Sequence, residues 1–349
     1  MTVFKREDSP SWMIEFTYLG QMVRRSSHTA SKTKAKELEQ RWRREIHDRV
    51  AAGKLPSIPF GDAIDRYFDT ILSPRGKEKS RAKDVYVLDK LRARFGEDTL
   101  LDNITSAEIA TYRDQLVTKH KLKPSTANRE ISYLRAIFNI AANDWNVSTA
   151  PFRVKMFKEP PGRVRWLTAD EEKRLLDECF PHLRPIVTFL MDSGCRKEEA
   201  LSLTWRDVVF EEDRTRILIA ADRSKTAAAT GKAVPKRTAE LLQELYKARP
   251  EGQGRVFLFI GKSKKGEPAL TPRPLGNIQK GFKAACQRAK IDDFHIHDLR
   301  HHYASRLVQR GVPIQRVQRL LGHKTMRMTE RYAHLAPSDL DDAVAVLDR

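Results

Sequence analysis

The sequence has few cysteines and no long apolar run. Cys179, Cys195 and Cys286 are odd in number and far apart, which argues against a disulfide framework or a Cys-x-x-Cys zinc site. No run of about 18 apolar residues occurs, so we expect no transmembrane helix. The N-terminus lacks the apolar core of a signal peptide, which predicts a cytoplasmic protein.

Acidic residues are outnumbered by basic ones. The 349 residues include 65 lysines and arginines against 46 aspartates and glutamates, giving a formal net charge of +19. Such an excess is typical of proteins that bind a polyanion, most often nucleic acid. Ribosomal and membrane-surface proteins share it, so charge alone does not define the function. The length allows two or three domains with separate cores.

Residues 1–54 predict a small N-terminal domain of strands and one helix. Apolar and polar residues alternate over 12–18, and the turn at 19–20 precedes a second strand, which indicates a β-hairpin. A basic helix is expected over about 31–51, followed by a proline-bearing linker at 55–59. The basic side chains of this helix form either a solvated face or a surface for DNA.

Residues 59–150 predict a compact helical domain of four helices. Apolar residues recur at helical spacing, and Thr105-Ser-Ala-Glu108 has the pattern of a helix-opening capping box. The apolar stripes are expected in the core. Basic side chains outside the stripes are candidates for phosphate contacts: Lys77, Lys79, Arg81, Lys83, Lys119, Lys121, Lys123 and Arg129.

Residues 165–349 predict an α-rich domain with a small antiparallel β-ribbon and a C-terminal tail. A capping-box pattern begins at Thr168, a strand is expected over 216–220, and the chain returns through 233–235. An amphipathic helix is expected over 275–291. We therefore expect a multidomain, mainly α-helical protein with small sheets in its first and last domains.

A short C-terminal segment gathers imidazoles, a guanidinium and a phenol. It contains His297-Asp-Leu-Arg300, Leu321-Gly-His323 and Tyr332. Residues three apart are neighbours on a helix, so His297 and Arg300 can share one pocket. Such a pocket suits a phosphodiester that is attacked by tyrosine.

Two glycines in this segment predict helix ends, the usual role of a glycine after the last helical turn. Gly311 and Gly322 divide it into a helix at about 298–310, a short helix at about 313–321, and a third helix from about Thr325. The tyrosine then falls on or near the last helix.

The order of the motifs resembles that of the tyrosine recombinase (phage integrase) family. Each motif alone is weakly specific, whereas five in this order are highly specific. The resemblance covers about 165–335 by motif and 1–150 by arrangement, with an arm-type domain before a core-binding domain. The motifs are Gly194-Cys-Arg196-Lys-Glu-Glu199-Ala-Leu-Ser-Leu-Thr-Trp205, Lys225 on the expected ribbon, His297-Asp-Leu-Arg300-His301, Leu321-Gly-His323 and Tyr332.

The resemblance implies a role for each site residue. Arg196 and Arg300 would hold the phosphate, because guanidiniums stay charged and present a planar fork to its oxygens. Tyr332 would attack phosphorus and form a covalent 3′-phosphotyrosine, while Lys225 would protonate the leaving 5′-oxygen. No metal and no cofactor are needed, because the ester keeps the bond energy.

The two motif histidines and the lysine leave alternatives open. His297 would accept the tyrosine proton or hydrogen-bond the phosphate, and His323 would donate a hydrogen bond to the phosphate. Lys225 is one of three lysines in its stretch, with Lys232 and Lys236.

Other polar residues near the motifs are expected to have supporting roles. Glu199 is three residues after Arg196 and is expected to pair with it or with a helix terminus. Cys195 is expected as a small buried residue. His301 and His302 are candidates for supporting or surface positions.

Three alternative functions are consistent with parts of the sequence. His297 and His301 are four apart, as in a zinc protease, but Asp298 replaces the glutamate base and Arg300 places a positive charge beside the metal. An architectural DNA-binding protein explains the charge but not the nucleophile cluster. A type IB topoisomerase uses the same phosphotyrosine, and relaxation of supercoils without strand exchange would distinguish it.

The expected partners are duplex DNA, at core and arm sites, and further copies of the chain. The resemblance implies a homo-tetramer on two duplexes, with DNA-bending or directionality proteins as candidate accessory factors. The tail over 336–349 carries four aspartates and apolar residues at helical spacing. It is expected either to pack on its own domain or to dock on a neighbouring protomer.

Overall fold

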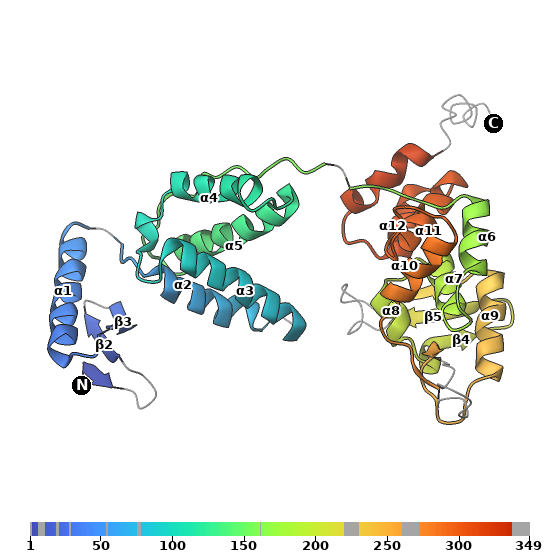
Figure 1. Cartoon of the computed structure of the whole chain (residues 1–349), viewed down its shortest axis with the longest axis horizontal. Helices are drawn as coiled ribbons and strands as arrows, with labels where there is room; N and C mark the ends of the chain where they lie inside the picture. Colours follow the sequence, from blue (N-terminus) through green and yellow to red (C-terminus); the bar gives the residue numbers. More distant parts are fainter. Residues whose placement is uncertain are drawn as a thin grey trace. The chain divides into compact units, whose positions relative to one another are not determined.

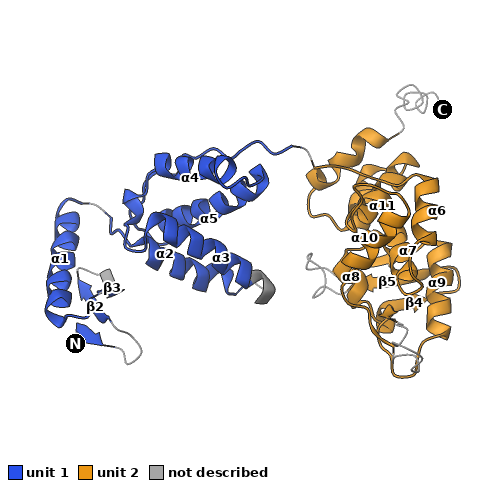
Figure 2. Ribbon diagram, in the orientation of Figure 1, with its two compact units in different colours: residues 1–160 blue, residues 161–349 orange. Residues whose placement is uncertain are grey.

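The computed structural model forms two compact units, Met1–Pro160 and Pro161–Arg349 (Figures 1 and 2). The structure describes residues 2–5, 11–18, 21–27, 29–53, 55–74, 78–160, 162–219, 230–259 and 272–336. Lys225 and the acidic tail after Ala336 lie outside the described residues. None of the helices in these ranges is long and apolar enough to cross a membrane.

The first unit begins with a three-stranded antiparallel sheet covered by one helix. Strands β1 (Val3–Lys5), β2 (Trp12–Tyr18) and β3 (Gln21–Ser26) are ordered β1-β2-β3, and α1 (Lys32–Ala51) follows. The predicted hairpin and basic helix are confirmed, whereas β1 is too short to show alternation in the sequence. The inward-facing residues form a small separate core of Val3, Ile14, Phe16, Val23, Ala35 and Ile46.

The rest of the first unit is helical, as predicted. Thr105 and Glu108 form the expected capping box, since Glu108 accepts a hydrogen bond from the Thr105 amide at 2.8 Å and its own amide donates to the Thr105 hydroxyl at 3.2 Å. The helices enclose one large core. They are α2 (Phe60–Tyr67), the π-helical turn η1 (Phe68–Leu72), α3 (Glu78–Phe95), the 3-10 turn η2 (Leu101–Asn103), α4 (Ser106–Thr118) and α5 (Pro124–Asn143).

The second unit packs helices around a small sheet and a core of about 30 buried residues. The predicted ribbon is confirmed as β5 (Thr215–Ile219) and β6 (Thr230–Ala233), and β4 (Val208–Phe210) adds a third antiparallel strand. The remaining elements are α6 (Ala169–Asp177), α7 (Arg184–Ser193), α8 (Lys197–Ser202), the 3-10 turn η3 (Trp205–Asp207), α9 (Lys236–Lys247), β7 (Leu258–Phe259), β8 (Arg273–Pro274), α10 (Gln279–Arg288), α11 (Asp298–Gln309) and α12 (Ile314–Leu321).

Helix α10 is shorter than the amphipathic pattern over 275–291 predicts. It begins at Gln279, whose amide donates to the Asn277 side chain at 2.9 Å. Leu275 and Ile278 are buried but precede the helix. The apolar pattern continues beyond the helix because the flanking loop also contributes to the core.

The C-terminal segment ends two helices at the predicted glycines. Gly311 and Gly322 have φ values of 76° and 65°, a conformation in which glycine is favoured. The third α-helix expected from about Thr325 is wrong: two 3-10 turns, η4 (Met326–Met328) and η5 (Glu330–Leu335), take its place. Turn η5 packs against α11 and α12, and η4 against α12, so tertiary contacts hold both turns.

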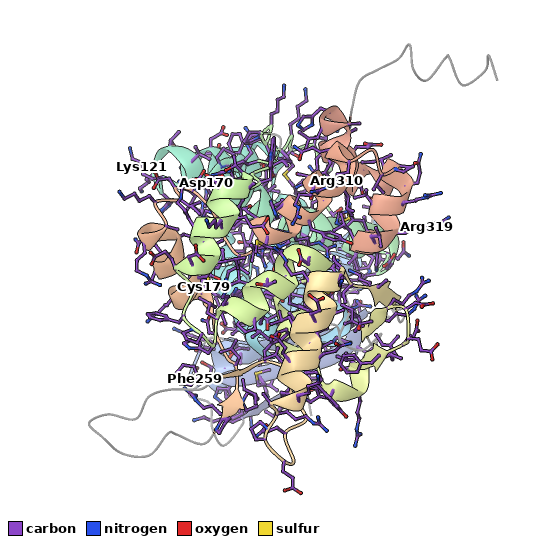
Figure 3. All side chains as sticks on the ribbon, turned by 90° about the vertical axis from the view of Figure 1, so that its right-hand side faces the viewer. Lys121, Asp170, Cys179, Phe259, Arg310 and Arg319 are labelled. Atoms are coloured by element: carbon purple, nitrogen blue, oxygen red, sulfur yellow. The ribbon has the colours of Figure 1, made fainter. Side chains whose placement is uncertain are left out.

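The second unit buries its thiols and exposes basic side chains. Cys179, Cys195 and Cys286 are buried free thiols. Arg310, at the end of α11, and Arg319, on α12, are exposed at the surface (Figure 3). The small buried thiols therefore act as core residues, as expected for Cys195.

Candidate active site

Helix α11 is the framework of the site. It packs against α7, α12 and η5, so residues far apart in the sequence converge on it. His297 is its N-cap, and Arg300 and His301 lie on its first turns. His297 and His301 are one helical turn apart, which places both rings on one face.

Arg300 ties together the ends of two helices. Its Nη1 donates to the carbonyl of Gly194, after α7, at 2.7 Å, and its Nη2 donates to the carbonyl of Leu321, at the end of α12. Carbonyls at helix ends lack intrahelical partners and carry partial negative charge. A guanidinium has five N–H donors, so three remain for an anion.

Arg196 is fixed by the carboxylate three residues later. The Glu199 side chain accepts from the Arg196 amide at 2.8 Å and from Arg196 Nη1 at 2.6 Å. Burial opposes ionisation of Glu199, but the hydrogen bonds from Arg196 outweigh it and lower the pKa of this carboxyl. The predicted support of Arg196 by Glu199 is confirmed.

Tyr332 is buried against His301. The tyrosine lies on η5 with 1% of its surface exposed, and its hydroxyl oxygen is 2.5 Å from His301 Nδ1. Burial raises the pKa of Tyr332 to about 12. Burial, followed by the neighbouring His297, lowers the pKa of His301 to about 4. Both side chains are therefore neutral near pH 7.

His297 and His323 flank this pair. The His297 ring meets the His301 ring edge to face, with centroids 5.2 Å apart. His323 follows α12, and its Nδ1 is 2.9 Å from the Thr329 hydroxyl, which leaves Nε2 as the other functional nitrogen. Burial, and then the charges of Arg300 and Arg196, lower the pKa of His323 to about 4.

The structure brings five of the six predicted site residues together. The positive charges of Arg196 and Arg300 act on each other and on His297 and His323, and Arg300 also acts on Tyr332. The sixth, Lys225, lies outside the described residues. An anion bound between the two arginines would relieve their mutual repulsion.

Lys232 is a further basic residue of this cluster. The sequence motifs indicated Lys225 in its place. It lies on β6 opposite Ile217 and is 5% exposed. Burial lowers the pKa of Lys232, the charges of Arg300 and Arg196 lower it further, and the carboxylate of Glu199 acts in the opposite direction. Its sequence signal is the alternation over 232–234, which points Lys232 inward.

His302 belongs to a separate buried network. Its Nδ1 accepts a hydrogen bond from the Leu167 amide at 3.1 Å, and its Nε2 lies 3.3 Å from Glu172. Arg237 bridges Glu172 and Asp192 with hydrogen bonds of 2.7–2.9 Å. His302 therefore links α11 to Glu172 of α6, and through Arg237 of α9 to Asp192 of α7.

The zinc-protease alternative gains no support from the described residues. His301 Nδ1 is engaged by Tyr332. Within the described ranges, no group of three or more histidine, cysteine, aspartate or glutamate side chains is placed to hold a metal ion.

Comparison with protein families matches two parts of the chain. Residues 165–339 match the phage integrase family, and residues 2–50 match the phage integrase N-terminal domain. The chain is 27% identical to the integrase of Salmonella phage P22, over 100% of this chain and 94% of that protein. It is 32% identical to the integrase of Haemophilus phage HP1, over 64% of this chain and 59% of that protein.

Solved structures share the fold. A Tn1549 transposon integrase in complex with circular intermediate DNA superposes with a TM-score of 0.64 at 17% identity, over 84% of this chain and 100% of that chain. A lambda integrase dimer bound to a COC′ core site superposes with a TM-score of 0.61 at 19% identity, over 95% of this chain and 94% of that chain. With its family match over half its length, the chain belongs to the phage integrase family and is an enzyme of the tyrosine recombinase class.

Proposed function

We propose that this protein is a site-specific DNA recombinase that integrates or excises a phage or other mobile element through a covalent 3′-phosphotyrosine. The observation that carries the proposal is the convergence of two guanidiniums, two motif imidazoles and a tyrosine hydroxyl around α11. Relatives of the chain are named integrases, and two similar structures are complexes with DNA.

The two arginines act on the scissile phosphate. Phosphoryl transfer places negative charge on the non-bridging oxygens, so catalysis depends on positioning and preorganised positive charge. Arg196 is held by Glu199 and Arg300 by two carbonyls, so neither guanidinium must be reoriented at the moment of reaction. His297 and His323 add hydrogen bonds to the same oxygens.

Tyr332 is the nucleophile. Its oxygen forms a bond to phosphorus while the bond from phosphorus to the 5′-oxygen breaks, and the 5′-oxygen takes a proton from Lys225. The 3′-phosphate stays on the tyrosine until the 5′-hydroxyl of another strand reverses the reaction. The ester preserves the bond energy, so religation requires neither ATP nor a metal ion.

Burial of Tyr332 couples cleavage to DNA binding. With 1% of the residue exposed, its hydroxyl must be uncovered before a phosphate reaches it. Assembly of four protomers on two duplexes is the event that we infer uncovers the hydroxyl.

Basic surfaces of the first unit supply the remaining DNA contacts. Helix α1 would bind arm sites, and the helical part would bind core sites, mainly through phosphates. The candidate residues are exposed: Lys32, Lys34, Lys36, Arg41 and Arg44 on α1, and Arg81, Lys83, Lys119, Lys121, Lys123 and Arg129 in the helical part.

A suicide substrate tests the proposal. The DNA is a nicked duplex carrying the attachment site, which is identified from the direct repeats that flank the genetic element. We expect wild-type protein to form a covalent adduct that survives denaturing electrophoresis, whereas Tyr332→Phe binds the same DNA and forms none. An adduct with Tyr332→Phe would contradict the assignment. Relaxation of supercoiled DNA without strand exchange between duplexes would favour the topoisomerase alternative.

A further inference from the structure

We propose that His301 accepts the proton of Tyr332 during DNA cleavage, which leaves His297 to hydrogen-bond the phosphate. The inference rests on the proposed function and adds a residue to its chemistry. As the tyrosine oxygen bonds to phosphorus, its proton passes to His301 Nδ1, and the electron pair of the O–H bond stays on the oxygen. The positive imidazolium then returns the proton when the phosphotyrosine is resolved.

The contact between the two groups is the first support. His301 Nδ1 is 2.5 Å from the Tyr332 hydroxyl oxygen, within hydrogen-bond distance of the atom that reacts. We assign the ring proton to Nε2, so that Nδ1 is the acceptor. His301 is 7% exposed and Tyr332 1%, so water does not compete strongly for this bond.

The position of His301 on α11 is the second support. It follows Arg300 directly and lies one turn after His297, whose ring centroid is 5.2 Å from that of His301. The His301 ring therefore contacts both His297, which we propose hydrogen-bonds the phosphate, and the tyrosine hydroxyl. His297, by contrast, is exposed at the N-terminus of the helix, where an incoming phosphate meets it first.

The acidities of the two groups define when the proton moves. Burial raises the pKa of Tyr332 to about 12 and lowers that of His301 to about 4, so a separate proton transfer between the two neutral groups is strongly unfavourable. The transfer must therefore accompany formation of the bond to phosphorus, when the phenol oxygen loses electron density. A bound phosphate also adds negative charge beside the imidazole and stabilises its protonated form.

The titratable and charged neighbours of His301 come from three parts of the chain. On α11 they are His297, Asp298 and Arg300, and on η5 Arg331. His323, after α12, also acts on it. Asp192 of α7 is paired with Arg237 instead. Asp298 favours the protonated imidazole, whereas the arginines oppose it until a phosphate neutralises them.

The test compares adduct formation by wild type, His301→Gln and His301→Ala on the nicked duplex between about pH 6 and pH 9. Removing a general base typically slows the step by about 10²–10⁴-fold. We expect that loss near pH 7 for His301→Gln. The deficit should shrink by up to about tenfold per pH unit, because hydroxide takes over removal of the phenol proton. Imidazole added to His301→Ala should restore part of the rate by occupying the vacated space.

Controls separate this role from a structural one. His302→Gln, next in sequence and also buried, should change stability without changing the pH dependence of cleavage. DNA binding and thermal unfolding of each variant show whether it is folded. A wild-type rate for His301→Gln, or an equal deficit at every pH without imidazole rescue, would overturn the inference. Absence of any adduct with wild-type protein would instead overturn the proposed function.

Discussion

Arg300 Nη1 donates to the carbonyl of Gly194 at 2.7 Å, at the point where Gly194 ends α7 in the left-handed conformation with φ of 60°. A Cβ atom built on Gly194 would lie 2.3 Å from Tyr303 Cδ1. Arg300, which we propose binds the phosphate, is thus oriented by a carbonyl that only a glycine places there without strain. One helix end therefore contributes directly to the geometry of the site.

Gly194→Ala is expected to lower both stability and DNA cleavage. Positive φ and the contact with Tyr303 should together cost about 2–4 kcal/mol. Any relief of the clash moves the carbonyl away from Arg300, which should slow adduct formation at least about tenfold. Urea unfolding and suicide-substrate cleavage measure the two effects.

Gly281→Ala is the matched control. Its added Cβ would meet Leu183 Cδ2 at 3.6 Å, an ordinary contact, within α10. Alanine should stabilise this helix by about 0.5–1 kcal/mol and leave cleavage unchanged. Equal effects of the two substitutions would contradict the role given to Gly194.

Arg196→Lys and Arg300→Lys are expected to separate catalysis from folding. Both should reduce adduct formation by about 10²-fold or more, because an ammonium cannot reproduce the planar fork. Arg300→Lys should also destabilise the protein by about 2–4 kcal/mol, because the carbonyls of Gly194 and Leu321 lose their donors. The side chain of Arg196 is 22% exposed. The free energy of unfolding of Arg196→Lys should therefore lie within about 1 kcal/mol of the wild-type value.

Thermal unfolding combined with adduct formation checks this contrast. If Arg196→Lys were as unstable as Arg300→Lys, the two arginines would share a structural role. Full cleavage by either variant would remove that arginine from the phosphate site.

Thr329→Val is expected to weaken cleavage through His323. The Thr329 hydroxyl is buried and 2.9 Å from His323 Nδ1, which fixes the ring with Nε2 free for the phosphate. Valine preserves the shape but not the hydroxyl, so cleavage should fall about tenfold and stability by about 1–2 kcal/mol. Thr329→Ser keeps the hydroxyl and should retain most of the cleavage rate; a serine variant as impaired as valine would argue for packing alone.

Glu172 is expected to make stability depend on acid pH. The His302 imidazole, whose Nε2 lies 3.3 Å from the carboxylate, and then the hydrogen bond from Arg237 lower the pKa of Glu172 from 4.5 to about 2. A lowered folded-state pKa stabilises the protein above the unfolded value, and that stability is lost as pH falls from about 4.5 towards 2. Glu172→Gln should therefore be less stable at pH 7 by roughly 3 kcal/mol, and the difference should shrink in that window.

Urea unfolding of Glu172→Gln at pH 7, 4 and 3 measures this dependence. The control is Glu211→Gln, because Glu211 pairs with Arg216 at the surface, with both side chains about 40% exposed. Its stability should differ from wild type by less than about 1 kcal/mol at each pH. A constant difference for Glu172→Gln at all three pH values would show that its ion pairs do not set the acid stability.

Much of the second unit was predictable because its signals are local. The glycines after α11 and α12, the capping box at Thr168 and the alternation in β5 each act within a few residues. The convergence of Arg196 with Arg300 was accessible only through the family resemblance. Spacing along the chain does not reveal that α7 and α11 are neighbours.

The sequence alone assigned His301 and His302 only supporting or surface positions, and the packing of α11 distinguishes them. His301 shares its motif with two other histidines, and nothing local distinguishes it from His302. The structure directs one ring to Tyr332 and the other to Glu172. The two residues differ because successive side chains on a helix point about 100° apart, towards different neighbouring elements.

The sequence by itself determined the helical architecture, the family and five side chains that lie together in the structure. Only the tertiary structure decided that Tyr332 lies on a 3-10 turn and is buried, that Arg300 is held by two helix ends, and that Lys232 faces the arginines. Helix ends and strand alternation depend on a few adjacent residues, whereas burial and hydrogen-bond partners depend on which distant segments pack together.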